Sequence, residues 1–156
     1  MELRHWLVAA VLSATTACAS AQIVVGQTAG FTGAVAATVK EATDGAALYF
    51  DAVNARGGVN GQKIVLVSLD DKFDPKLAAA NARTLIAEKG AVALFLTRGT
   101  PHNELIIPVL DELRVPLLGP STGAMLLHSP VKRNVFNVRS TYQRESEKAV
   151  ALLSAI

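Results

Sequence analysis

Residues 44–71, DGAALYFDAVNARGGVNGQKIVLVSLDD, contain the signals of a helix, its end, a tight turn and a buried strand. Apolar side chains recur there at helical spacing, at Ala46, Tyr49, Phe50 and Val53. This pattern predicts a helix with one buried face, and Gly57 suits the left-handed backbone that ends a helix. The aliphatic run Ile64–Leu69 then predicts a strand that is covered on both faces. Together these signals indicate half of a parallel α/β unit.

The rest of the chain continues the alternation of strands and helices. Four further strands are predicted, at Ile23–Gly26, Ala91–Leu96, Val115–Gly119 and Val135–Val138. Gln27–Gly33 is predicted to be a loop, because it contains two glycines and polar residues. The fold class that follows is α/β, a parallel sheet of about five strands with helices on both faces. In such sheets ligands bind at the carboxyl ends of the strands.

Three further helices are predicted between and after these strands. The first begins at Asp74 with Pro75 in its first turn, and its buried stripe is Ala78, Ala82, Leu85 and Ile86. The second follows the loop 97–103 and buries Ile106, Val109, Leu110 and Leu113. Pro108 lies inside it, so we expect a bend or a late start. The last helix begins near residue 140 or 141, and its apolar stripe is Ala149, Leu152, Leu153 and Ile156. With only one lobe present, we expect Leu152, Leu153 and Ile156 to be poorly covered.

The stretch 45–75 also carries an ordered set of short motifs. These are Val53-Asn54, Gly57-Gly58, Gly61, Asp70-Asp71 and Asp74-Pro75. Their order resembles the signature of type I periplasmic solute-binding proteins, specifically the branched-chain amino-acid (Leu/Ile/Val) binding family of ABC importers. The resemblance covers residues 23–156 and corresponds to about the first lobe of a two-lobed family member. We therefore expect residues 22–139 to form an N-terminal ligand-binding lobe. Residues 140–156 would be a hinge crossing and the first helix of a truncated second lobe.

The loops after the third and fourth strands are the expected ligand site. Each precedes a helix N-terminus, where unpaired N–H groups favour an anion such as an amino acid's carboxylate. The resemblance implies ligand contacts from Thr100 in the first loop and from Ser121, Thr122 and Gly123 in the second, although Gly123 lacks the usual hydroxyl. It also implies that Phe31 lies near the pocket, unless its ring packs under its own loop.

Several neighbouring residues leave alternatives open. We include Gly99 among the candidate ligand-binding residues, and it also matches, with Phe73, the positions of a disulfide that some relatives carry. Arg98 either pairs with a ligand carboxylate or extends into solvent, and His102 either contacts the ligand or caps its own helix.

The acidic residues Asp70, Asp71 and Asp74 lack the spacing of a calcium loop, so a strand end and a helix cap account for them. The loop GQTAGFTG fits neither phosphate-binding fingerprint. No metal and no cofactor are therefore expected.

One enzyme motif requires a separate test. Residues 119–123, GPSTG, match the G-x-S-x-G turn that presents the nucleophile of α/β-hydrolases. That fold needs an acid and then a histidine after Ser121, and no histidine follows Glu145 or Glu147. A hydrolase that uses Ser121 is therefore only a remote alternative, and we expect no enzyme activity.

The N-terminus and the composition bear on location and partners. An apolar run at 6–12 and the A-x-A site Ala19-Ser20-Ala21 predict a signal peptide over residues 1–21, cleaved near Ala21, and hence a periplasmic protein. A lipid anchor on Cys18 is the alternative, but Thr15 stands where that motif has leucine. The formal charge of +2, without a basic stripe, argues against nucleic-acid binding.

Two functions remain after these exclusions. The first is the periplasmic substrate-binding component of an ABC importer, which captures an amino acid or a similar small polar ligand between two lobes and delivers it to an inner-membrane permease. The second is a ligand-binding sensory or receptor domain of the same fold. DNA-binding regulators of this fold are disfavoured, because an export signal takes the place of their helix-turn-helix. Since the chain ends one helix after the fifth strand, we expect it to be a fragment of a longer binding protein.

Overall fold

A computed structural model of the chain describes residues 22–155. The predicted signal peptide and Ile156 lie outside the described residues. One all-parallel sheet, in the order β2-β1-β3-β4-β5, forms the centre of the molecule. Its strands are β1 (Ile23–Ala29), β2 (Ile64–Asp70), β3 (Ala93–Phe95), β4 (Leu117–Leu118) and β5 (Val135–Phe136). The predicted five-stranded parallel sheet is therefore confirmed, although its last three strands are shorter than expected.

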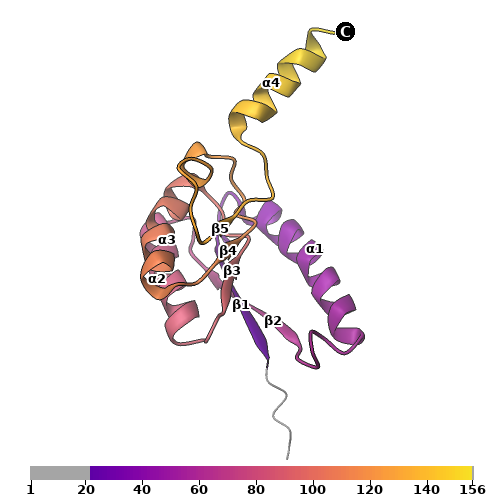
Figure 1. The fold of residues 1–156 in the computed structure, drawn as a ribbon, viewed down its shortest axis with the longest axis vertical. Coiled ribbons are helices and arrows are strands. Elements are labelled where there is room, and N and C mark those ends of the chain that lie inside the picture. The colour runs from indigo at the N-terminus through magenta and orange to yellow at the C-terminus, as the bar shows by residue number, and fades with distance from the viewer. Residues whose placement is uncertain (1–21, 156) are drawn as a thin grey trace, which may run out of the picture.

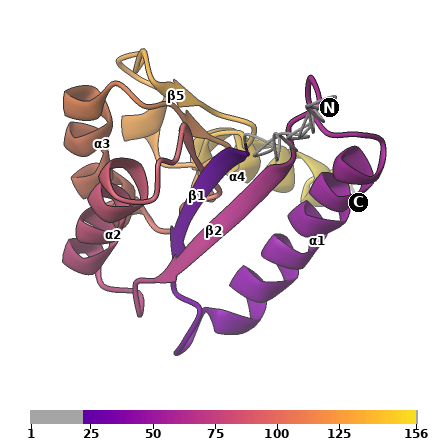
Figure 2. The ribbon, with the colours of Figure 1, turned by 90° about the horizontal axis from the view of Figure 1, so that it is seen from below.

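Helices lie on both faces of this sheet, as predicted. They are α1 (Ala36–Ala55), α2 (Pro75–Ala87), α3 (Thr100–Leu113) and α4 (Tyr142–Leu153), with a short 3₁₀ turn, η1 (Met125–Leu127), after β4. Figure 2 shows α1 on one side of the sheet and both α2 and α3 on the other. Within residues 22–155 no helix combines the length and the apolarity that crossing a bilayer requires.

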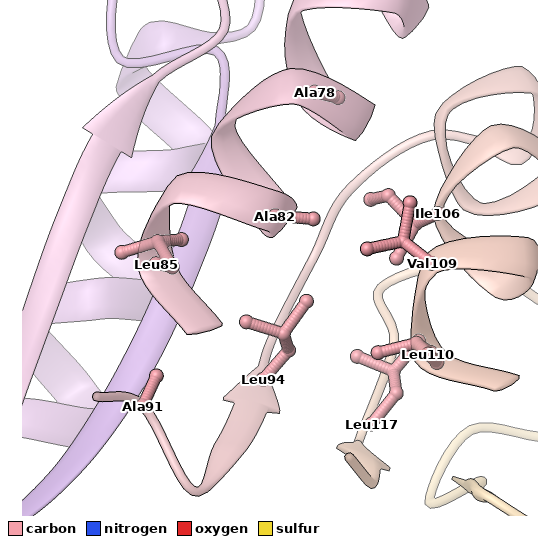
Figure 3. Close-up of a cluster of buried hydrophobic side chains, with 9 residues drawn as sticks. All are labelled: Ala78, Ala82, Leu85, Ala91, Leu94, Ile106, Val109, Leu110 and Leu117. Carbon is pink, nitrogen blue, oxygen red and sulfur yellow. The ribbon is translucent and has the colours of Figure 1, made fainter. Parts of the chain in front are cut away.

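The hydrophobic core lies where α2 and α3 pack on the sheet. Its buried residues are Ala78, Ala82, Leu85, Ala91, Leu94, Ile106, Val109, Leu110 and Leu117 (Figure 3). Alanines line the face of α2 that is turned toward α3, and the leucines and isoleucine of α3 and the sheet fill the space beside them. The stripes predicted for these two helices are confirmed, apart from Ile86 and Leu113, which pack at the edge of the cluster and are only partly buried.

The first strand is longer than the sequence indicated. β1 extends to Ala29, so the assignment of Gln27 and Thr28 to a loop was wrong. Both are fully buried, and their polar groups find partners inside the fold. The Gln27 side chain donates to Thr43 Oγ1 at 3.0 Å and accepts from Ser68 Oγ at 2.9 Å. Buried polar residues can occupy a central strand when they are satisfied in this way.

The first helix also differs from its prediction. It begins at Ala36, well before Asp44, and no side chain caps its N-terminus. The prediction that Tyr49 lies on the buried face was wrong, because the residue is 67% exposed. The helix packs mainly against β2, the edge strand of the sheet, so only a narrow face of α1 is covered. For the same reason β2 is half-buried along most of its length rather than covered on both faces.

The two later helices correct further details. α3 begins at Thr100, inside the predicted loop, and runs through Pro108, so the late start was wrong. Pro108 is exposed, so the carbonyl that loses its helical donor there lies at the surface. α4 begins close to the predicted start, after Thr141, whose side chain caps it, but it buries none of its described residues. Figure 1 shows it extending away from the body, with Leu152 and Leu153 about 70% exposed (67% and 72%).

Candidate functional site

The carboxyl ends of β3 and β4 lie next to each other, which places the two expected site loops side by side. Leu94 pairs with Leu117 within the sheet, and an isolated parallel bridge joins Arg98 to Ser121 beyond it. The Ser121 N–H donates to the Thr97 carbonyl at 2.8 Å. The loop after β3 and the loop after β4 therefore form one continuous edge.

Three hydroxyl groups meet at this edge. Thr100 Oγ1 lies 2.9 Å from Thr122 Oγ1, and Thr122 Oγ1 lies 3.0 Å from Tyr142 Oη. Thr122 is buried, whereas Thr100 is half-buried and occupies the first position of α3. The first N–H groups of a helix have no acceptor within the helix, and the dipole there favours negative charge. We call Thr100, Thr122 and Tyr142 the hydroxyl cluster.

A buried asparagine fixes the loop that carries Thr100. Asn103 Nδ2 donates to the Gly99 carbonyl at 2.7 Å, and Thr97 Oγ1 donates to Asn103 Oδ1 at 2.6 Å. Thr97 and Asn103 are both fully buried. Sequence reasoning missed this role, and the only signal for it is a polar residue in the first turn of a helix that follows a glycine.

Gly99 and His102 pack tightly behind the same loop. Gly99 has φ of +96°, and a Cβ there would lie 2.4 Å from His102 Nδ1, so only glycine fits. The His102 ring is buried and tilted against Phe73, with centroids 4.4 Å apart. Neither ring nitrogen has a hydrogen-bond partner within residues 22–155, so the helix-capping alternative for His102 was wrong. Phe73 and Gly99, the positions matched to a disulfide, both border this imidazole.

Ser121 lies at the same edge as the hydroxyl cluster but contributes to a different surface. Successive side chains of an extended segment point in opposite directions, which separates Ser121 from Thr122. Ser121 lines a small pocket beneath α1, together with Gln27, Val39, Ala42, Leu96 and Arg98. Arg98 is half-buried there. Ligand contacts were predicted from the hydroxyls of both Ser121 and Thr122. Of these two, the Thr122 hydroxyl is the one that contacts the Thr100 hydroxyl.

Phe31 lies in the loop after β1, beside the end of β2. Its N–H donates to Asp70 Oδ1 at 2.9 Å, and Thr32 Oγ1 donates to Asp70 Oδ2 at 2.7 Å. The bond from Thr32 contributes most to lowering the pKa of the Asp70 carboxyl. Phe31 is half-buried, which is compatible with a position near the pocket and with packing of its ring under its own loop.

The neighbouring carboxylates have structural partners. Asp71 is buried and accepts from Thr28 Oγ1 at 3.1 Å, and its burial raises its pKa. Asp74 caps α2 by accepting from the N–H groups of Leu77 and Lys76, which lower its pKa. Among residues 22–155 no group of three or more His, Cys, Asp or Glu side chains is arranged to hold a metal ion.

Tyr142 joins α4 to the loop after β4, and sequence reasoning did not single it out. Its N–H donates to the Gly123 carbonyl at 2.9 Å. A Cβ on Gly123 would lie 2.6 Å from the Ser140 carbonyl oxygen, so the missing side chain is what permits this approach. Thr122 is the main cause of a lowered pKa for the Tyr142 phenol, and Arg139 lies over the ring at 5.0 Å from its centroid.

Comparison with known sequences gives a consistent set of relatives. The sequence profile of a family described as periplasmic binding protein matches residues 22–155. A Leu/Ile/Val-binding protein of Rhizobium johnstonii is 32% identical over 134 residues, which are 84% of this chain and 35% of that protein. An amino acid binding protein of Pseudomonas aeruginosa is 38% identical over 108 residues, 67% of this chain and 28% of that protein. The chain thus spans about a third of the length of the curated relatives it matches.

Solved structures agree with this result. A substrate-binding periplasmic protein from Ralstonia solanacearum superposes with a TM-score of 0.80 at 35% identity, covering 86% of this chain and 38% of that chain. An extracellular ligand-binding receptor from Verminephrobacter eiseniae gives a TM-score of 0.80 at 31% identity, with coverages of 86% and 38%. The fold of residues 22–155 therefore corresponds to part of these larger binding proteins.

Proposed function

Because this chain belongs to the periplasmic binding protein family, we propose that it captures an amino acid or a similar small polar ligand in the periplasm. It would do so as the substrate-binding component of an ABC importer, with an inner-membrane permease as its partner. The names of the relatives support this class of ligand, since they describe amino acid and Leu/Ile/Val-binding proteins. The family consists of substrate-binding proteins rather than enzymes, so the serine turn at Ser121 has no catalytic part in the proposal.

The observation that carries this proposal is the contact between the Thr100 and Thr122 hydroxyls at 2.9 Å. It brings two hydroxyls from different loops to one point at the N-terminus of α3. A carboxylate accepts hydrogen bonds from hydroxyl and amide donors, and a helix N-terminus adds a favourable dipole. The Thr100 hydroxyl and the first N–H groups of α3 can donate at this point, so a small anionic guest suits it better than a cation does.

We also propose that residues 22–139 form the ligand-binding lobe and that residues 140–156 cross toward a second lobe. The support comes from α4. It carries apolar side chains at Val150, Leu152 and Leu153, yet all three are exposed (63%, 67% and 72%). An amphipathic helix normally buries such a stripe against another element. A second lobe that closes on the first would enclose the ligand more completely than one edge of a sheet can.

Calorimetric titration of the chain with L-leucine, compared with leucinamide, tests the proposal. Leucinamide has an uncharged amide in place of the carboxylate, so we expect only leucine to bind. Thr100→Val keeps the shape of the side chain but removes the hydroxyl, and it should weaken leucine binding about 2- to 13-fold, the loss of one net hydrogen bond. Thr38→Val, on the exposed surface of α1, is the matched control and should bind as the wild type does.

The same titration is repeated with a panel of amino acids, amides and aromatic acids. Binding of any member that carries a carboxylate, with the same sensitivity to Thr100→Val, supports the proposal. If no carboxylate of the panel binds to the folded chain, the proposed function is wrong.

A further inference from the structure

We propose that Tyr142 is a positioning residue of the candidate ligand site. Its phenol donates to Thr122, Thr122 donates to Thr100, and the Thr100 proton is thereby left for a carboxylate guest. This inference rests on the proposed function and extends it to a residue on α4. Its basis is the pair of contacts that make the hydroxyl cluster, at 2.9 Å and 3.0 Å.

A count of protons shows what the hydroxyl cluster can offer. Three hydroxyls carry three protons, and the two contacts within the cluster use two of them. The Ala124 N–H, 3.3 Å from Thr122 Oγ1, occupies part of the acceptor capacity of the middle hydroxyl. One proton therefore remains for a guest, and the direction of the chain of bonds decides whether Thr100 or Tyr142 carries it.

The acidity of the groups decides that direction. A phenol has a pKa near 10 and is a better proton donor than the hydroxyl of threonine. Arg139 lies over the aromatic ring, and its positive charge makes the phenol a stronger donor still. Tyr142 is therefore the donor to Thr122. The Thr100 proton is then free at the N-terminus of α3, where an anion is favoured.

The backbone holds Tyr142 in the position that this role requires. Its N–H donates to the Gly123 carbonyl at 2.9 Å, and Gly123 immediately follows Thr122. The absence of a Cβ at Gly123 lets the chain at Ser140 and Tyr142 lie against this loop. The phenol is thus fixed from both ends, by the backbone bond at Gly123 and by the hydroxyl bond at Thr122.

Ionisation of Tyr142 should reverse the chain of bonds. A phenolate can only accept, so Thr122 turns to donate to it, and Thr100 then donates to Thr122 and has no proton for a guest. The charged groups around the ring are Arg139 and Glu145, which pair with each other through two bonds of 2.8 Å. The loop after β4 and the first turn of α3 face Tyr142 with the hydroxyls of Thr122 and Thr100. Affinity for a carboxylate should therefore fall as Tyr142 ionises.

The test compares Tyr142→Phe with Tyr49→Phe on the full chain, using L-leucine as the probe. The chain has two tyrosines, and Tyr49 is exposed on α1, so the second variant is a matched control. At about pH 7 we expect Tyr142→Phe to bind leucine about 2- to 13-fold more weakly, the range of one net hydrogen bond. Tyr49→Phe should bind as the wild type does. Far-ultraviolet circular dichroism shows whether both variants are folded.

The pH dependence separates positioning from a structural role. The ratio of the Kd of Tyr142→Phe to that of the wild type should fall toward or below one as the pH rises to about 10. Ionisation of leucine itself affects both proteins equally and cancels in this ratio. In Tyr49→Phe only Tyr142 contributes phenolate absorbance, and its titration midpoint should rise when leucine is bound.

Each other outcome overturns the inference. Equal binding by the wild type and Tyr142→Phe at every pH excludes a role for the phenol and leaves the proposed function intact. A weakening that is the same at every pH, with no movement of the phenolate titration, assigns Tyr142 a structural role only. If the wild type binds neither leucine nor any other carboxylate of the panel, this inference and the proposed function are both wrong.

Discussion

The substitution Gly99→Ala tests the packing that holds Thr100 at the start of α3. Gly99 has φ of +96° and ψ of 138°, a conformation that residues with a Cβ rarely adopt. Forcing alanine into such a region costs about 1–3 kcal/mol. The new Cβ would also lie 2.4 Å from His102 Nδ1, and overpacking a buried site costs about 1–3 kcal/mol more. We therefore expect a loss of about 2–6 kcal/mol in the free energy of unfolding.

Urea unfolding followed by circular dichroism measures this loss, and two further variants divide it into its causes. Gly57→Ala is the control for backbone strain, because φ there is +100° and a Cβ would meet no atom within 4 Å. The double variant Gly99→Ala/His102→Ala removes the clash but keeps the backbone strain. Its loss in free energy of unfolding should therefore be about 1–3 kcal/mol smaller than the sum of the losses of the two single variants. A clash at Gly99 is excluded if Gly99→Ala loses no more free energy of unfolding than Gly57→Ala does. It is also excluded if the losses of the two single variants add up to that of the double variant.

The remaining predictions concern the core and a helix cap. Leu110→Ala should lower the free energy of unfolding by about 2–5 kcal/mol because the side chain is fully buried, whereas Leu105→Ala, at 41% exposed on the same helix, should cost under about 1 kcal/mol. Equal urea midpoints for these two variants would contradict the assignment of Leu110 to the hydrophobic core. Asp74→Ala removes a carboxylate whose pKa is lowered by the N–H groups at the start of α2. The stability that this cap supplies is therefore present above about pH 4 and is lost as the pH falls through the lowered pKa of Asp74. The gap in urea midpoint between wild type and Asp74→Ala should therefore be larger at pH 7 than at about pH 2.5. A gap independent of pH would contradict the assignment.

The sequence predicted those parts of the fold whose signals are local. Apolar spacing in α2 and α3 identified the buried stripes, since a helix repeats every 3.6 residues and one face must meet the sheet. The cap at Asp74 followed from its place before Pro75. The start of α1 was missed because no capping side chain marks it.

Errors arose where distant residues decide the structure. Gln27 has the composition of a loop residue, but Thr43 and Ser68 satisfy its side chain inside the sheet. The sequence indicated two adjacent site loops, which the structure contains, but it gave no sign that Thr122 rather than Ser121 meets Thr100. Tyr142 lies 20 residues beyond Thr122, and no periodicity links them. Side-chain partners of this kind depend on how the strands are ordered, which a single sequence does not state.

The most direct test of the account is an NMR titration of the uniformly ¹⁵N-labelled chain with L-leucine. Amide resonances of the two site loops, at Gly99, Thr100, Thr122 and Gly123, should move together and saturate at the same leucine concentration, and leucinamide should leave them in place. Shifts confined to the opposite end of the sheet, for example at Asp111 and Arg114, would contradict the account, as would an unchanged spectrum.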